Sequence, residues 1–298
     1  MRHWICGLLI VAAVAFTASA PAQVSAVDAE SSDIVVKGIR DRDRQIANFI
    51  DTLADAPVGG QLARFEEAAC PAAIGLAPGQ NVAVAARMRS VAKAAGIPVG
   101  KEGCRPNVFV VVAQDKKAMV RTIREKWTDP RGDRVRIPEQ SGPAVALHLE
   151  GLLDANGIRA GTKQEEGDGR SSYYTVEMAH GSSRLSPASR PHFLATALVV
   201  EPAALAGLTT TQLADYAAMR LLARTDPSRL EKLVAPTILT ILDAPMGSAV
   251  PLTLTQWDFG FLKALYGSAE NRYANQQRTE MRQLLSKELA KPVKEGEE

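Results

Sequence analysis

Apolar residues at helical spacing identify the first strong element, a helix over residues 40–54. Its charged residues, among them Arg42, Asp43 and Arg44, lie on the opposite face. We expect that charged face to be solvated. The apolar face consists of four residues: Ile46, Phe49, Ile50 and Leu53.

Two more helices are predicted in the N-terminal half. Residues 78–95 carry Pro78 at a first-turn position and Gly96 just after the last turn. Asp115 is the expected N-cap of a helix over residues 116–127. The apolar stripe of the helix at 78–95 consists of Val82, Ala85, Met88, Val91 and Ala92.

Strand-like runs alternate with these helices. Residues 107–113 form an unbroken apolar run, which is typical of a buried central strand. Residues 173–178 and 192–200 are expected to pair across the Ser/Pro/Gly-rich turn between them, and shorter strands are expected at 61–66 and 144–150. The mixture predicts an α+β fold with a mixed sheet and packed helices.

A charged stretch at residues 128–142, interrupted by Pro and Gly, divides the predicted elements into two parts. The N-terminal α/β part covers residues 34–127, and the C-terminal part covers residues 143–290. The C-terminal part is predicted to contain a helix over residues 209–224 and a long charged helix over residues 269–290.

The N-terminus has the pattern of a secretory signal peptide. A basic start precedes an apolar run over residues 4–16 and then small residues, so we expect removal of residues 1–22 by cleavage before Gln23. The apolar run is shorter than the roughly 20 residues needed to span a bilayer; an uncleaved anchor is the alternative. Residues 23–33 and 291–298 are expected to be disordered.

Charge and cysteine usage narrow the class of protein. The chain has 35 basic and 33 acidic side chains, and this balance does not indicate nucleic-acid binding. The mature chain keeps two cysteines, Cys70 and Cys104. In an oxidising compartment we expect them to form one disulfide, which would stabilise the fold by about 3 to 4 kcal/mol. We therefore predict a periplasmic or secreted protein with no stable membrane span after signal cleavage.

Residues that could carry chemistry are few. The mature chain has three histidines, His148, His180 and His192, and their spacing matches no zinc motif. The alternative metal set is His148, Glu150 and His192. No glycine-rich phosphate loop and no Gly-x-Ser-x-Gly elbow occurs in the sequence. We therefore expect no cofactor, no metal and no catalytic set.

Two stretches resemble known families. The run Asp33-Ile-Val-Val-Lys-Gly38 resembles the energy-coupling box of outer-membrane receptors, although an edge strand or extended arm is the other interpretation. Residues 254–267, which read Leu-Thr-Gln-Trp-Asp-Phe-Gly-Phe-Leu-Lys-Ala-Leu-Tyr-Gly, resemble the closing helix of zincin-type metallopeptidases. The alternative for this stretch is a helix that Asp258 caps and whose apolar residues pack inward.

The zincin resemblance implies an edge strand at residues 193–201 followed by an active-site helix at residues 209–224. The family's His-Glu-x-x-His motif is missing there, because residues 211–222 contain no histidine. The chain is also similar to uncharacterised secreted proteobacterial proteins with a zincin-like half that lacks these ligands. The resemblance implies a pseudo-peptidase with a zincin-like C-terminal half, and the first candidates to line its cleft are Gln212, Asp215 and Tyr216.

Three functions follow as hypotheses. The first is a non-catalytic binding or scaffolding protein of the cell envelope, with an envelope protein or peptide as its partner. The second is a metal-dependent hydrolase with an unrecognised site. The third, which depends on residues 33–38 alone, is an accessory of outer-membrane transport.

Overall fold

The computed structural model describes residues 28–56, 60–127, 142–154, 156–157, 162–165, 172–175, 181–184, 186–245 and 247–291. The chain divides into two units, Met1–Asp41 and Arg42–Glu298. The predicted signal peptide and His180 lie outside the described residues.

Helix α1 (Asp28–Leu53) begins much earlier than the sequence pattern predicts. Residues 33–38, which we predicted as a short strand, are helical, and so is the described part of the segment 23–33 that we predicted as disordered. An isolated strand has no neighbour for its backbone N–H and C=O groups, whereas a helix satisfies them internally. A run that continues an amphipathic helix therefore extends it at lower cost than it could start a strand.

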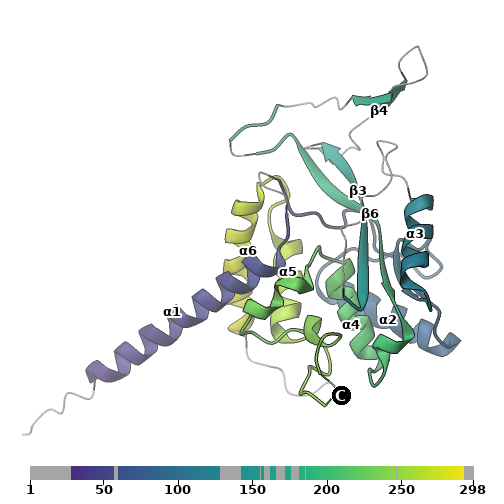
Figure 1. The fold of residues 1–298 in the computed structure, drawn as a ribbon. Helices are drawn as coiled ribbons and strands as arrows, with labels where there is room; N and C mark the ends of the chain where they lie inside the picture. The colour runs from purple at the N-terminus through teal and green to yellow at the C-terminus, as the bar shows by residue number, and fades with distance from the viewer. Residues whose placement is uncertain are drawn as a thin grey trace, which may run out of the picture. The chain divides into compact units, whose positions relative to one another are not determined.

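The unit Arg42–Glu298 is built on one four-stranded mixed sheet, with strand order β1-β2-β6-β3 (Figure 1). The parallel strands are β1 (Pro71–Ile74), β2 (Val108–Val112) and β6 (Ser189–Val200), and β3 (Ala144–Asp154) runs antiparallel to β6 at the edge. Strands from both predicted parts of the chain thus share a single sheet. The α+β fold with a mixed sheet and packed helices is confirmed.

The strand pairing differs from the prediction at β6. We expected residues 173–178 to pair with it, but β5 (Ser172–Thr175) pairs instead with β4 (Thr162–Glu165) in a separate two-stranded sheet. Because β6 already has β2 on one side and β3 on the other, it has no edge left for a third strand. Residues 61–66 form no strand and contribute one bridge, between Arg64 and His192.

Helices cover the two faces of the sheet unequally. Val110 and Leu198 belong to a large core that includes residues of α2 (Pro78–Ala94), α4 (Thr210–Leu221) and α5 (Gln256–Gly267). Val111, Val145, Leu147, Ala197 and Val199 form a smaller core on the other face, against which residues of α3 (Lys116–Lys126) pack. Among the described helices, α3 alone contributes residues to this smaller core. This face of the sheet is therefore covered by fewer helices than the face with the large core.

The remaining helical elements complete the large core. α6 (Ala274–Leu289) packs along α5, and its buried residues include Met281 and Leu285. The C-terminal half of α1 inserts Phe49 against Trp257 and Phe261, with ring centroids 5.3 and 6.2 Å away. Three short 3₁₀ turns lie around α4: η1 (Pro202–Leu205), η2 (Pro227–Lys232) and η3 (Ile238–Thr240).

Two further local predictions are confirmed and one is wrong. Asp115 caps α3 by accepting from the backbone N–H of Ala118 at 2.8 Å. Cys70 and Cys104 form the predicted disulfide. Val82, however, is 69% exposed, and Val84 takes the buried position in α2. Apolar residues occupy so many positions of α2 that the sequence does not single out one buried face. The predicted face was therefore wrong by part of a turn.

Candidate functional site

Helix α4 stands where the zincin resemblance places an active-site helix. It starts with a capping box, in which the Thr209 hydroxyl accepts from the backbone N–H of Gln212 and the Gln212 side chain accepts from that of Thr209. The Gln212 amide also donates to the carbonyl of Pro251 at 2.9 Å. Gln212 is therefore buried and holds the helix start, with both ends of its amide engaged.

Asp215, one turn further along α4, is fully buried and heavily hydrogen-bonded. Its carboxylate accepts from Arg87 Nε at 2.8 Å and from Arg87 Nη2 at 3.0 Å. It also accepts from the Thr253 hydroxyl at 2.6 Å and from the backbone N–H of Leu254 at 2.8 Å. The hydrogen bond with Asp215 is the main cause that raises the pKa of Arg87 above its usual value. These contacts join α2, α4 and the segment that leads into α5.

Tyr216 is the third candidate, and its side chain is also buried. The Arg220 guanidinium, one turn further along, donates to its hydroxyl at 3.1 Å and lies 5.8 Å from the ring centroid. Burial raises the pKa of Tyr216. The three residues expected to line a cleft are only 4%, 0% and 2% exposed, so in this structure they are parts of the core.

The three residues of the alternative metal set lie close in the sheet but do not converge. β3 and β6 pair His148 with Thr196, Glu150 with Phe193, and Gly151 with His192. Glu150 forms an ion pair with Arg224, which follows α4. Among the described residues, no group of three or more His, Cys, Asp and Glu side chains could hold a metal ion.

His148 is held as a neutral imidazole between β3 and α4. Its Nε2 lies 3.0 Å from the carbonyl oxygen of Arg220, so this nitrogen carries the hydrogen that the carbonyl accepts. The ring also packs on Phe193 at a centroid distance of 4.9 Å. Burial, with Arg224 and Arg220 nearby, lowers the pKa of His148 to about 3. A neutral, partly buried ring with these contacts is suited to a structural role.

The stretch that carries the zincin resemblance forms α5, and its first turn is fixed by Asp258. Thr255 and Asp258 make a reciprocal capping box. The Asp258 carboxylate further accepts from the Thr237 hydroxyl at 2.6 Å and from the N–H of Ile238 at 2.8 Å. Burial raises the pKa of Asp258 despite these donors. Thr255 is therefore the N-cap residue, and Asp258 completes the cap from the third helical position and also anchors η3.

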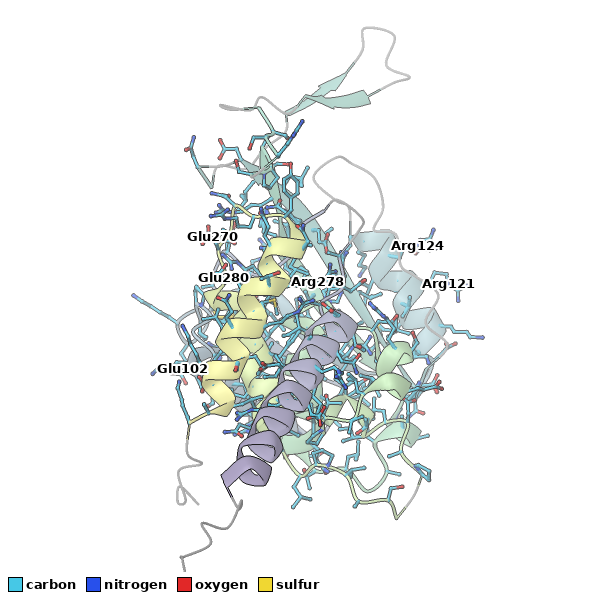
Figure 2. All side chains as sticks on the ribbon, turned by 90° about the vertical axis from the view of Figure 1, so that its left-hand side faces the viewer. Glu102, Arg121, Arg124, Glu270, Arg278 and Glu280 are labelled. Carbon is cyan, nitrogen blue, oxygen red and sulfur yellow. A yellow bond between two sulfur atoms is a disulfide. The ribbon has the colours of Figure 1, made fainter. Side chains whose placement is uncertain are left out.

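A second polar cluster joins the start of β6 to the end of α5. Arg64 pairs with Glu66 and Glu270 at 3.0 Å each, and Arg190 pairs with Glu270 at 2.9 Å. Arg64 also donates to the carbonyls of Leu265 and Ser268. Glu270, which precedes helix α6 in the sequence, is labelled in Figure 2. Two arginines and two glutamates balance in charge, which indicates a structural network.

The outer side of β3 is a row of backbone groups that no described strand pairs. Thr196 donates to the carbonyl of Asn107 and Val200 accepts from Ala113, so these residues of β6 face β2. The alternate residues of β6, opposite Val145 and Leu147, therefore face β3. It follows that every second residue of β3 directs its N–H and C=O away from the sheet. These residues are Ala144, His148, Glu150 and Leu152; Ala146 has the same orientation, and its backbone has a partner.

Comparisons with known proteins give no match, since no family model, no curated protein and no solved structure matches this chain. Among the described helices, none is long and apolar enough to cross a membrane.

Sequence reasoning missed the partners that define the site, Arg87 and Arg224. Arg87 on α2 and Arg224 after α4 are two of many basic residues in the sequence, and the partner of each is far away along the chain.

Proposed function

We propose that this chain is a non-catalytic binding protein of the bacterial cell envelope, secreted or periplasmic, which takes up an extended polypeptide segment of a partner. The predicted signal peptide and the Cys70–Cys104 disulfide support the compartment, because disulfides persist in oxidising environments. The outer edge of β3 carries the binding part of the proposal.

The edge strand offers the chemistry that an extended peptide needs. A peptide in a strand conformation binds an open edge through main-chain hydrogen bonds. β3 is 11 residues long and contains neither Pro nor Lys, two residues that often protect an edge. It does carry Glu150 and Asp154, and its pairing with β6 is irregular between Leu149 and Glu150. In the C-terminal half of the strand, the outward groups of His148, Glu150 and Leu152 are candidates for pairing.

The interior of α4 supports the non-catalytic part. The polar residues of that helix that could act on a substrate are committed to the fold: Gln212 in a cap, Asp215 in the Arg87 network and Tyr216 with Arg220. The resemblance of residues 254–267 to zincin-type metallopeptidases, without the His-Glu-x-x-His ligands, fits a protein that keeps a peptidase-like frame and no metal. A zincin-like C-terminal half is part of this proposal.

Peptide display on the purified, tag-free mature protein tests this function. We expect selected peptides to slow hydrogen exchange of the amides of residues 148–152. Leu152→Pro removes one outward N–H at a position where an edge strand tolerates proline. It should weaken binding about ten-fold or more, because one main-chain hydrogen bond and its neighbours are lost.

Leu152→Ala is the matched control, since it shortens the same side chain and keeps the N–H. It should bind nearly as well as the unaltered protein. Binding that survives Leu152→Pro, or protection that appears on α6 instead of β3, would contradict the proposed edge. Cleavage of the selected peptides by the protein would contradict the non-catalytic role.

A further inference from the structure

We propose that the Cys70–Cys104 disulfide is a thiol–disulfide exchange site that an external thiol opens at Cys104. The two cysteines differ in accessibility. Cys70 is only 3% exposed, and its backbone is held at the start of β1, where its N–H donates to Asn107 Oδ1 at 2.7 Å. Cys104 is partly exposed, in a loop whose other residues from 101 to 106 are exposed. An incoming thiolate therefore reaches the sulfur of Cys104 first.

A guanidinium lies directly beside both sulfurs. Arg89 Nη2 is 3.1 Å from Cys104 Sγ and 3.5 Å from Cys70 Sγ, while its Nη1 donates to the carbonyl of Gly100 at 2.6 Å. Among the described residues, no carboxylate forms an ion pair with Arg89. Its positive charge is therefore available to a thiolate, which a nearby cation stabilises.

The backbone around Cys104 leaves room for this contact. A Cβ on Gly100 would lie 2.7 Å from Cys104 Sγ, so only glycine permits the sulfur and the Gly100 carbonyl to approach Arg89 together. Lys101 and Arg105 flank the same loop and are exposed. One exposed carboxylate, Glu102, lies between them, so the loop keeps a net positive charge that favours the approach of an anionic thiol compound, such as a thiol-bearing peptide with free carboxylates.

The exchange proceeds in two balanced steps. The incoming thiolate attacks Cys104 Sγ, a new S–S bond forms there, the Cys70–Cys104 bond breaks, and Cys70 leaves as a thiolate beside Arg89. A second thiolate then attacks the sulfur of the small molecule, which releases Cys104 as a thiolate and a disulfide of the two small thiols. The small thiol is the reductant and supplies both electrons.

Incubation of the folded mature protein with reduced glutathione, followed by acid quench and peptide mapping, tests the site. We expect the glutathione adduct on Cys104. Arg89→Met should slow the first step about ten-fold, because the buried Cys70 thiolate loses its cation. Arg89→Lys should recover part of the rate. Lys93→Met removes a cation of the same helix that donates to neither sulfur, so this variant should react like the unaltered protein.

Folding defects are separated from the proposed role by a second measurement. In concentrated urea, the unaltered protein and Arg89→Met should be reduced at the same rate, since the arginine is then no longer held beside the sulfurs. An adduct on Cys70, equal rates for the folded Arg89→Met and unaltered proteins, or a disulfide that reacts only after unfolding would each overturn the proposal.

Discussion

Several buried polar residues in this protein are matched by donors or acceptors from other parts of the chain. Asp258 illustrates this, because its four hydrogen-bond donors come from Thr237, Ile238 and Thr255. A buried carboxylate without them would be costly. Polar side chains that are candidates for a functional site in the sequence, such as Asp215, instead hold loops and helix ends in position.

His148 gives a pH-dependent prediction at the residue scale. Its pKa in the folded protein, about 3, lies below the 6.5 of the unfolded chain. As the pH falls below about 6.5, the unfolded chain takes up the proton first, so this stabilisation is complete above pH 6.5 and is lost toward pH 3. Between pH 7.5 and 5, the unaltered protein should lose about 2 kcal/mol more free energy of unfolding than His148→Gln.

Urea unfolding at the two pH values measures this difference, and the comparison with His148→Gln removes the contribution of the other titrating groups. If both proteins lose the same free energy over that range, the ring of His148 is not held neutral by its surroundings.

Pairs of helices are joined by side chains whose contacts the sequence does not reveal. The sequence predicted α2, α4 and the core of β2 because their apolar periodicity is strong and local. It could not predict that Arg87 meets Asp215, because 128 residues separate them and solvated charges on helix faces are common. Similarly, β6 could not be recognised as internal, since strand order depends on contacts between distant segments.

Asp215→Asn tests how strongly this network joins the elements. The substitution leaves the Arg87 guanidinium without its charged partner. It also replaces one acceptor oxygen by an NH2 group that faces a hydrogen-bond donor. The free energy of unfolding should therefore fall by about 3 kcal/mol. Asp51→Asn is the control, because its pair with Arg282 is exposed on both sides. It should cost less than about 1 kcal/mol. Equal losses for the two variants would show that the Asp215 network contributes no more than a surface pair.

The four-stranded sheet has the disulfide beside β1 at one edge and β3 at the other, where no described strand pairs with the outer side of β3. The α+β class and the disulfide could be predicted, because both follow from local pattern and cysteine count. For the candidate site, the sequence predicted that Gln212, Asp215 and Tyr216 lie together on one helix, which is α4. It did not predict that these side chains face the core. Whether a helix face is buried depends on the elements that pack over it, and here the α2 helix and residues 251–254 cover it.

The most direct test of the account is the zinc content of the purified, tag-free mature protein after dialysis against excess zinc and then against zinc-free buffer, with His148→Ala measured in parallel. The account predicts well below one zinc per chain for both proteins, because the described residues provide no ligand cluster. One zinc per chain that is lost in His148→Ala would contradict the non-catalytic, ligand-free assignment and favour a metal-dependent hydrolase.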